Sequence, residues 1–152
     1  MDSRMIWTDS DFENMSWHDC PIHGISFSDN FKLLLDLDYI SQWISKGKYF
    51  DFRLAPCTLV FENVYNVNLE NSSTILTIDT VDRENSRKPQ NADYIGRDTE
   101  YDWFIDFVQG GMSFTSTGFK QYARRPAAII RNQKLTLVER GGISFDITQN
   151  YL

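Results

Sequence analysis

The sequence predicts a mainly β protein built from antiparallel hairpins, and three observations support this. Alternating apolar and polar segments flank short turns at Asp29-Asn30 and at Gly110-Gly111. Aromatic residues make up 14% of the chain, and aromatic side chains favour strands. No long helical pattern alternates with strands, as a parallel α/β fold would require. We therefore expect a two-sheet sandwich or an open barrel with one or two short helices, and an α+β fold is the alternative.

The length of the chain, 152 residues, predicts a single domain spanning 1–152. A domain of this size buries enough apolar surface to hold a core without disulfides or metals. One segment departs from the alternating pattern: residues 83–100 are polar and contain Pro89, Gly96 and several Asn and Asp. We expect a long mobile loop there.

The first elements are a short helix and a hairpin. Thr8–Met15 has the pattern of a short helix capped by Thr8 or Asp9. Ile22–Ser28 and Phe31–Tyr39 then alternate as two strands. If the turn between them has two residues, His23 lies directly opposite Asp36, whereas a three-residue turn shifts the pairing by one and removes this contact.

The second strand of this hairpin has two distinct faces, because side chains alternate along a strand. We expect one face to lie in the core, and it carries Leu33, Leu35, Leu37 and Tyr39. The opposite face carries Leu34, Asp36 and Asp38.

The middle of the chain contains one ambiguous segment and one long strand. Ile40–Tyr49 fits either one or two helical turns or a continued strand. Ala55-Pro56 is expected to interrupt pairing, since proline lacks the backbone N–H. The longest alternating run, Cys57–Leu69, follows as a strand, and Ile75–Val81 fits either a strand or a helix.

Two further hairpins are predicted in the last third. Tyr101–Val108 and Met112–Gln121 pair around the two glycines, which places Phe107 opposite Phe114. Lys134–Val138 and Ile143–Ile147 form another hairpin, with its turn at 139–142.

Charge and composition argue against several classes of partner. The net charge is −6 and no long run of Lys and Arg occurs, so we expect neither nucleic acid nor an anionic membrane as a partner. No apolar run approaches the ~20 residues that span a bilayer, and the first residues lack the apolar stretch of a secretory signal. The two cysteines do not form a C-x-x-C pair. We expect a cytoplasmic protein with free thiols and no cofactor.

The candidate site with the clearest geometry gathers both histidines of the chain with carboxylates. Imidazole nitrogens and carboxylate oxygens bind divalent metals, and a carboxylate can instead orient a histidine as a general base. The alternative is structural, because a cross-strand His–Asp pair is also an ordinary hydrogen bond. The candidate catalytic residues are His18, His23 and Asp36, and the candidate metal ligands are these three with Asp38; Asp19 lies beside them in sequence.

Two other groups are weaker candidates for a site. Cys20 lies near both histidines, so a thiol nucleophile is one interpretation and a buried, unreactive thiol is the other. Lys120, Gln121, Arg124 and Arg125 are either an anion site or ordinary salt-bridging surface residues. The candidate binding residues are therefore Lys120, Arg124 and Arg125, together with Trp17.

Several motifs together resemble a group of small bacterial proteins without assigned function. They are WHDCPIHG at 17–24, FKLLLDLDYISQW at 31–43, APCTLVFENV at 55–64, and YDWFIDF with GFKQYARRP at 101–107 and 118–126. Some proteins of this general kind are encoded beside toxins and look like immunity proteins. The resemblance implies a single-domain bacterial protein and supplies no catalytic residues.

We therefore expect a non-catalytic cytoplasmic protein that binds another protein, with an immunity or accessory role. Its acidic charge suits a basic partner. The alternative is a metal-dependent hydrolase or small-ligand enzyme that uses the His/Asp cluster.

Overall fold

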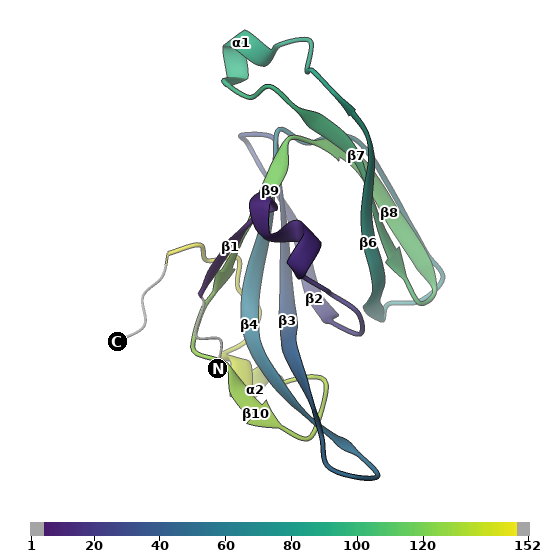
Figure 1. Cartoon of the computed structure of the whole chain (residues 1–152), viewed down its shortest axis with the longest axis vertical. Coiled ribbons are helices and arrows are strands. Elements are labelled where there is room, and N and C mark those ends of the chain that lie inside the picture. Colours follow the sequence, from purple (N-terminus) through teal and green to yellow (C-terminus); the bar gives the residue numbers. More distant parts are fainter. Residues whose placement is uncertain (1–4, 149–152) are drawn as a thin grey trace.

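The computed structural model describes residues 5–148 (Figure 1). Over this range the chain forms ten strands and three short helices. The strands are β1 Ile6–Thr8, β2 Pro21–Ser28, β3 Lys32–Ser45, β4 Phe50–Glu62, β5 Tyr65–Asn71, β6 Leu76–Arg87, β7 Glu100–Phe107, β8 Gly110–Ser116, β9 Gly118–Ala123 and β10 Ala128–Ile130. The helices are the 3₁₀ helix η1 Asp9–Asn14, α1 Ala92–Ile95 and α2 Leu137–Arg140. None of these described helices is long and apolar enough to cross a membrane.

The strands form one open antiparallel sheet. Their order is β1-β9-β4-β3-β2-β6-β7-β8-β5, and β10 pairs with β4 beside this path. The prediction of a mainly β, antiparallel fold is confirmed. The two-sheet sandwich is wrong, and the single sheet is open and does not close into a barrel. The reason is that β2 pairs with β6 at Pro21–Thr77 and Ile22–Leu76. These few pairs join all strands into one sheet, and its ends, β1 and β5, do not meet.

The sheet bends so that distant strands share one core. Phe61 of β4 lies 5.0 Å from Trp103 of β7 and 4.7 Å from Phe114 of β8, measured between ring centroids. Three strands separate β4 from β7 in the sheet order, so only a strong bend brings these rings together. Figure 1 shows β6, β7 and β8 set apart from β1 to β4. The core between them is aromatic, and edge-to-face ring pairs add to the stabilisation from burial.

The first hairpin has a three-residue turn, so its register differs from the two-residue prediction. Ser28 pairs with Lys32, and Phe31 in the turn has a positive φ of 58°. A bulge between Ile22 and Gly24 then absorbs the extra residue and restores the Ile22–Leu37 pair. Because His23 is the bulged residue, Gly24 lies opposite Asp36 and the predicted His23–Asp36 contact is wrong.

The two faces of β3 are as predicted, and both are buried. Leu33, Leu35 and Leu37 are fully buried in the core and Tyr39 nearly so. On the opposite face Asp36 and Asp38 are also fully buried. Carboxylates are almost never buried without partners, so this face must meet other polar groups.

Strand β3 is longer than expected, whereas the single strand expected over Cys57–Leu69 is wrong: β4 begins at Phe50 and ends at Glu62, and residues 65–69 belong to β5. Residues 40–45 continue β3, which decides between the two interpretations of this segment. The predicted break at Ala55-Pro56 is wrong, because both residues lie within β4. Pro56 falls between the ladder that β4 makes with β9, beginning at Cys57, and the ladder with β10, ending at Leu54. Its missing N–H therefore costs no ladder hydrogen bond.

The second hairpin turns earlier than predicted. Phe107 pairs with Gly110 and Trp103 pairs with Phe114, so the predicted Phe107–Phe114 pair is wrong. The two glycines belong to β8 rather than to the turn. At Gly110 the reason is close packing: a Cβ atom there would lie 2.1 Å from the backbone oxygen of Glu70 in β5.

Three segments in the remaining chain test the other predictions. The helix near the N-terminus is confirmed as η1, with Thr8 as its N-cap. The loop expected over 83–100 is shorter, since β6 extends to Arg87 and α1 lies within it. The third hairpin is wrong: its first half enters α2, and no strand forms at 143–147. The side chain of Thr136 caps α2 by accepting the Glu139 N–H, and Gly141 ends it at φ 78°.

Candidate functional site

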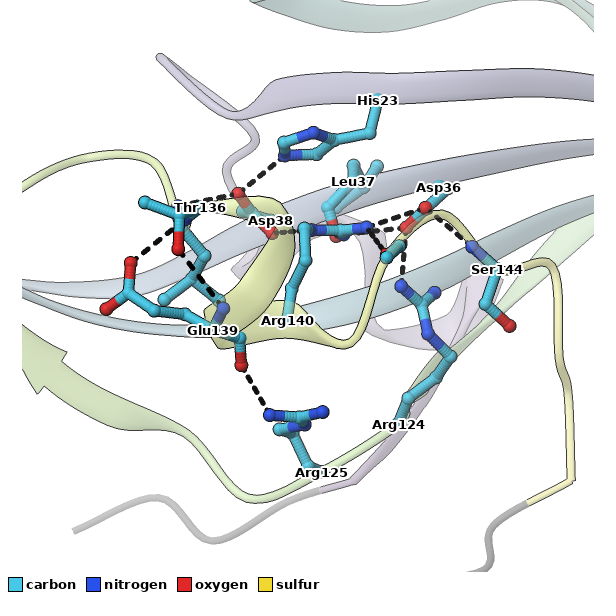
Figure 2. A network of polar contacts seen from close by, with 12 residues as sticks. His23, Asp36, Leu37, Asp38, Arg124, Arg125, Thr136, Glu139, Arg140 and Ser144 are labelled. Carbon is cyan, nitrogen blue, oxygen red and sulfur yellow. Dashed lines mark hydrogen bonds and ion pairs between the residues drawn. The ribbon is translucent and has the colours of Figure 1, made fainter.

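Asp36 and Arg140 form the centre of a buried polar network (Figure 2). Arg140 Nη1 donates to Asp36 Oδ2 at 2.7 Å and Nη2 donates to Oδ1 at 2.7 Å. Both side chains are fully buried. A planar guanidinium matches a carboxylate in this two-pronged geometry, and burial makes the attraction stronger than it would be in water.

Asp38 extends the network on the same face of β3. Its Oδ1 accepts Arg140 Nε at 3.0 Å, and its Oδ2 accepts His23 Nε2 at 2.8 Å and the Leu135 N–H at 3.0 Å. Burial alone would raise the pKa of Asp38. The hydrogen bonds from His23 and Leu135, with the charge of Arg140, outweigh burial and lower that pKa.

Arg124 and the chain after α2 complete the network. Arg124 donates to Asp36 Oδ1 at 2.6 Å and to Thr58 Oγ1 at 2.9 Å. The Ser144 N–H donates to Asp36 Oδ2 at 2.9 Å. All four oxygens of the two carboxylates therefore accept at least one hydrogen bond from the protein itself. Figure 2 shows Arg140 lying between the two carboxylates, while Arg124 approaches Asp36 from below.

The predicted metal or catalytic cluster is not assembled. His18 is exposed, contacts the Asp79 carbonyl oxygen at 3.1 Å and stacks on Trp43. Asp19 accepts a hydrogen bond from Gln133. Among the residues that the structure describes, no three His, Cys, Asp or Glu side chains gather as metal ligands do. Of the four candidate metal ligands, only His23, Asp36 and Asp38 lie together. Arg124 and Arg140 bond the two carboxylates where a metal ion would otherwise bind.

Both cysteines lie in the core. Cys20 and Cys57 are free thiols with no exposed surface. Burial raises the pKa of Cys20 to about 12 and also raises that of Cys57. The thiolate, which is the nucleophilic form, is therefore disfavoured, and the structural interpretation of Cys20 fits the geometry.

The candidate binding residues near β9 do not form one site. Arg124 is part of the network, whereas Arg125 donates to the carbonyl oxygen of Glu139 and Lys120 is exposed. Gln121 is fully buried and accepts the Trp17 indole N–H at 2.8 Å. Trp17 itself is buried, so it contributes to the core rather than to a binding surface.

A cleft that the sequence does not predict lies at the end of the molecule that carries α1 (Figure 1). Its volume is about 470 Å³, which lies within the range typical of ligand sites. Two turns and α1 form its walls, with aromatic and amide side chains. The lining residues are Asn30, Phe31, Asn63, Val64, Tyr65, Asn91, Tyr94, Ile95 and Glu100.

The cleft has an exposed aromatic rim and a buried acidic floor. Phe31 is 72% exposed and Tyr94 is 92% exposed, whereas Glu100 is 5% exposed. The Tyr65 hydroxyl donates to Glu100 Oε2 at 2.5 Å, and Arg87 Nε donates to the same oxygen at 2.8 Å. Burial, followed by the bond to Glu100, raises the pKa of Tyr65. The sequence does contain one indication of this rim: Phe31 directly follows the turn residues Asp29-Asn30, and turn tips are exposed, so an aromatic side chain there is expected on the surface.

No protein-family model matches the chain, and comparisons with curated proteins and with solved structures find no match either. The resemblance to small bacterial proteins therefore stays a prediction.

Proposed function

We propose that the protein is a non-catalytic binding protein that holds a protein partner at the cleft beside α1. The observation that carries this proposal is the rim of Phe31, Tyr65 and Tyr94, three aromatic side chains that are exposed around one cleft. Tyr and other aromatic residues are enriched where proteins bind one another, because they bury a large area at a small entropic cost.

The charge of the chain supports a basic partner. With a net charge of −6, the protein attracts a basic surface and speeds its encounter, especially at low salt. An immunity or accessory role in the cytoplasm fits such a protein, since neutralising a basic toxin requires a complementary surface and no chemistry.

The enzyme alternative receives less support from the geometry. A hydrolase at the His/Asp cluster would need carboxylate oxygens free to bind a metal or to orient a water. In the structure the oxygens of Asp36 and Asp38 are already bonded to Arg124, Arg140, His23 and backbone N–H groups. These bonds attach the chain after β10 to β3, which is a structural role.

Site-specific photo-crosslinking tests the proposal. A benzophenone amino acid at position 94 would probe the rim, and the same group at Val138 is the control. Val138 is equally exposed, at 92%, and lies on α2, which is far from α1 (Figure 1). We expect a protein of the source cell to crosslink from position 94 and not from 138.

The captured protein must then bind the purified chain. Calorimetry should give a 1:1 complex that Tyr94→Ala and Phe31→Ser each weaken by about tenfold or more, the loss typical of a central aromatic contact. Crosslinking from both positions alike, or a complex that both substitutions leave unchanged, would overturn the proposal.

A further inference from the structure

We infer that the cleft takes a basic side chain, lysine or arginine, of the protein partner, with Glu100 as its hydrogen-bond acceptor and the aromatic rim as its walls. This inference rests on the proposed function, because it names the chemical group that would enter the same cleft. Three observations support it: an oxygen of Glu100 without a partner among the described residues, the net negative charge beside the cleft, and the aromatic rings of the rim.

Glu100 has one carboxylate oxygen in use and one available. Oε2 accepts both the Tyr65 hydroxyl and Arg87 Nε. No hydrogen bond reaches Oε1 from the described part of the chain. Within residues 5–148, the fully buried side-chain atoms that lack a hydrogen-bond partner are Asn71 Oδ1 and Gln121 Nε2. Oε1 of Glu100 is not one of them, so it keeps some solvent-accessible surface. Since Glu100 lines the cleft and Oε1 has no partner within the described residues, we infer that this oxygen can accept a hydrogen bond from a donor that enters.

The charges beside the cleft favour a cation. Arg87 bonds Glu100 and also donates to Asp102 Oδ1 at 3.0 Å. One guanidinium therefore serves two carboxylates, and the hydrogen bonds from Arg87 and Asn85 lower the pKa of Asp102, which keeps it ionised. The group as a whole carries one uncompensated negative charge. An entering carboxylate or phosphate would be repelled, whereas an ammonium or guanidinium group would be attracted.

The aromatic rim adds to the same preference. The face of a phenyl or phenol ring attracts a cation, and the attraction grows when water is excluded. The walls are also held in place before binding: the Val64 N–H donates to the Phe31 carbonyl at 2.8 Å, and Asn63 Nδ2 donates to Thr117 at 2.9 Å. A site with fixed walls loses less entropy when a flexible side chain enters it.

Three small probes test the inference without knowledge of the partner. They are the N-acetyl amides of lysine, of norleucine, which has the same chain without the charge, and of glutamate. In a titration followed by ¹H–¹⁵N NMR, we expect lysine to bind in the millimolar range and to shift the amides of 30–31, 63–65 and 91–96. Norleucine should bind at least about tenfold more weakly, since it lacks the charged hydrogen bond, and glutamate should not bind.

Substitutions in the chain then locate the contact. Glu100→Gln should weaken lysine binding about tenfold, and the exposed Glu84→Gln is the matched control that should not change it. Glu100 is buried, so Tyr94→Ala supplies a second test that leaves the fold intact, with an expected loss of about two- to fivefold. Equal binding of the lysine and norleucine amides, or binding of the glutamate amide, would overturn the inference.

The same substitutions separate this inference from the proposed function. A captured protein partner that binds Glu100→Gln as tightly as the native chain would leave the proposed function standing and overturn the basic side chain. Conversely, the lysine amide could bind in the cleft although no protein partner is found. That result would overturn the proposed function and still support the preference of the cleft for a basic group.

Discussion

Arg140 and Asp36 lie 104 residues apart in the chain, yet form a two-pronged ion pair with both nitrogen–oxygen distances at 2.7 Å. The pair joins the last residue of α2 to the middle of β3. Because Arg140 also bonds Asp38, one side chain neutralises much of the charge that burial of β3 would otherwise leave unpaired. This arginine, together with the Leu135 and Ser144 N–H groups that bond the same two carboxylates, attaches the segment after β10 to the sheet.

Removing this arginine should cost much of the stability. Arg140→Met keeps the length and the apolar stem of the side chain but leaves Asp36 and Asp38 with fewer buried partners. We expect a loss of about 3–5 kcal/mol in the free energy of unfolding, measured by urea denaturation. Arg125→Met is the control, because Arg125 is exposed, and it should cost less than about 1 kcal/mol. Equal losses for the two variants would contradict a structural role for the network.

The network also predicts how stability depends on pH. The pKa of Asp38 is lower in the folded chain than its ordinary value of about 3.9. Ionised Asp38 therefore stabilises the fold above about pH 4, and this contribution is lost as the pH falls through the lowered pKa. In urea titrations between about pH 7 and pH 2, Asp38→Asn should be less stable at neutral pH and lose less stability on acidification. Asp29→Asn, at an exposed turn, should follow the native chain, and a steeper acid loss in Asp38→Asn would refute the assignment.

The sequence predicts local features well, because they depend on neighbouring residues. The alternation of Leu33, Leu35 and Leu37 places these side chains in the core, and the residues around Thr8 predict η1. The prediction of a strand register is wrong where the conformation of a single residue determines the length of the turn. Phe31 in a left-handed conformation lengthens the first turn by one residue, and no propensity rule favours a phenylalanine there.

The site is harder to predict, because its partners come from distant parts of the chain. Asp36 and Asp38 can be placed on one face of a strand from spacing alone. Their partners Arg124 and Arg140 follow 88 and 104 residues after Asp36, and nothing local to either arginine indicates the contact. A pair of carboxylates on an otherwise apolar strand does signal that basic groups must cover it, since such charges are not buried alone.

The cysteines should be unreactive in the folded chain. Cys20 has a pKa of about 12 and no exposed surface, and Cys57 is equally buried. We expect an aromatic disulfide reagent at about pH 8 to modify neither thiol within minutes, and both thiols of the chain to react at once in concentrated urea. Rapid reaction of one thiol under native conditions would indicate that Cys20 is accessible and would revive the nucleophile interpretation.

The pairing of β5 with β8 makes a sharp prediction for two adjacent glycines. A Cβ atom at Gly110 would lie 2.1 Å from the Glu70 backbone oxygen and 2.6 Å from the Asn71 Cα, whereas at Gly111 the nearest atoms lie at 3.5 Å. Backbone atoms cannot move aside without breaking the strand pair, so Gly110→Ala should destabilise the chain by more than about 1 kcal/mol. Gly111→Ala should change stability by less than about 0.5 kcal/mol. Thermal unfolding of the two variants measures the difference. If both alanines are tolerated equally, β5 does not pair with β8 in this register, and the Tyr65 wall of the cleft would have to lie elsewhere.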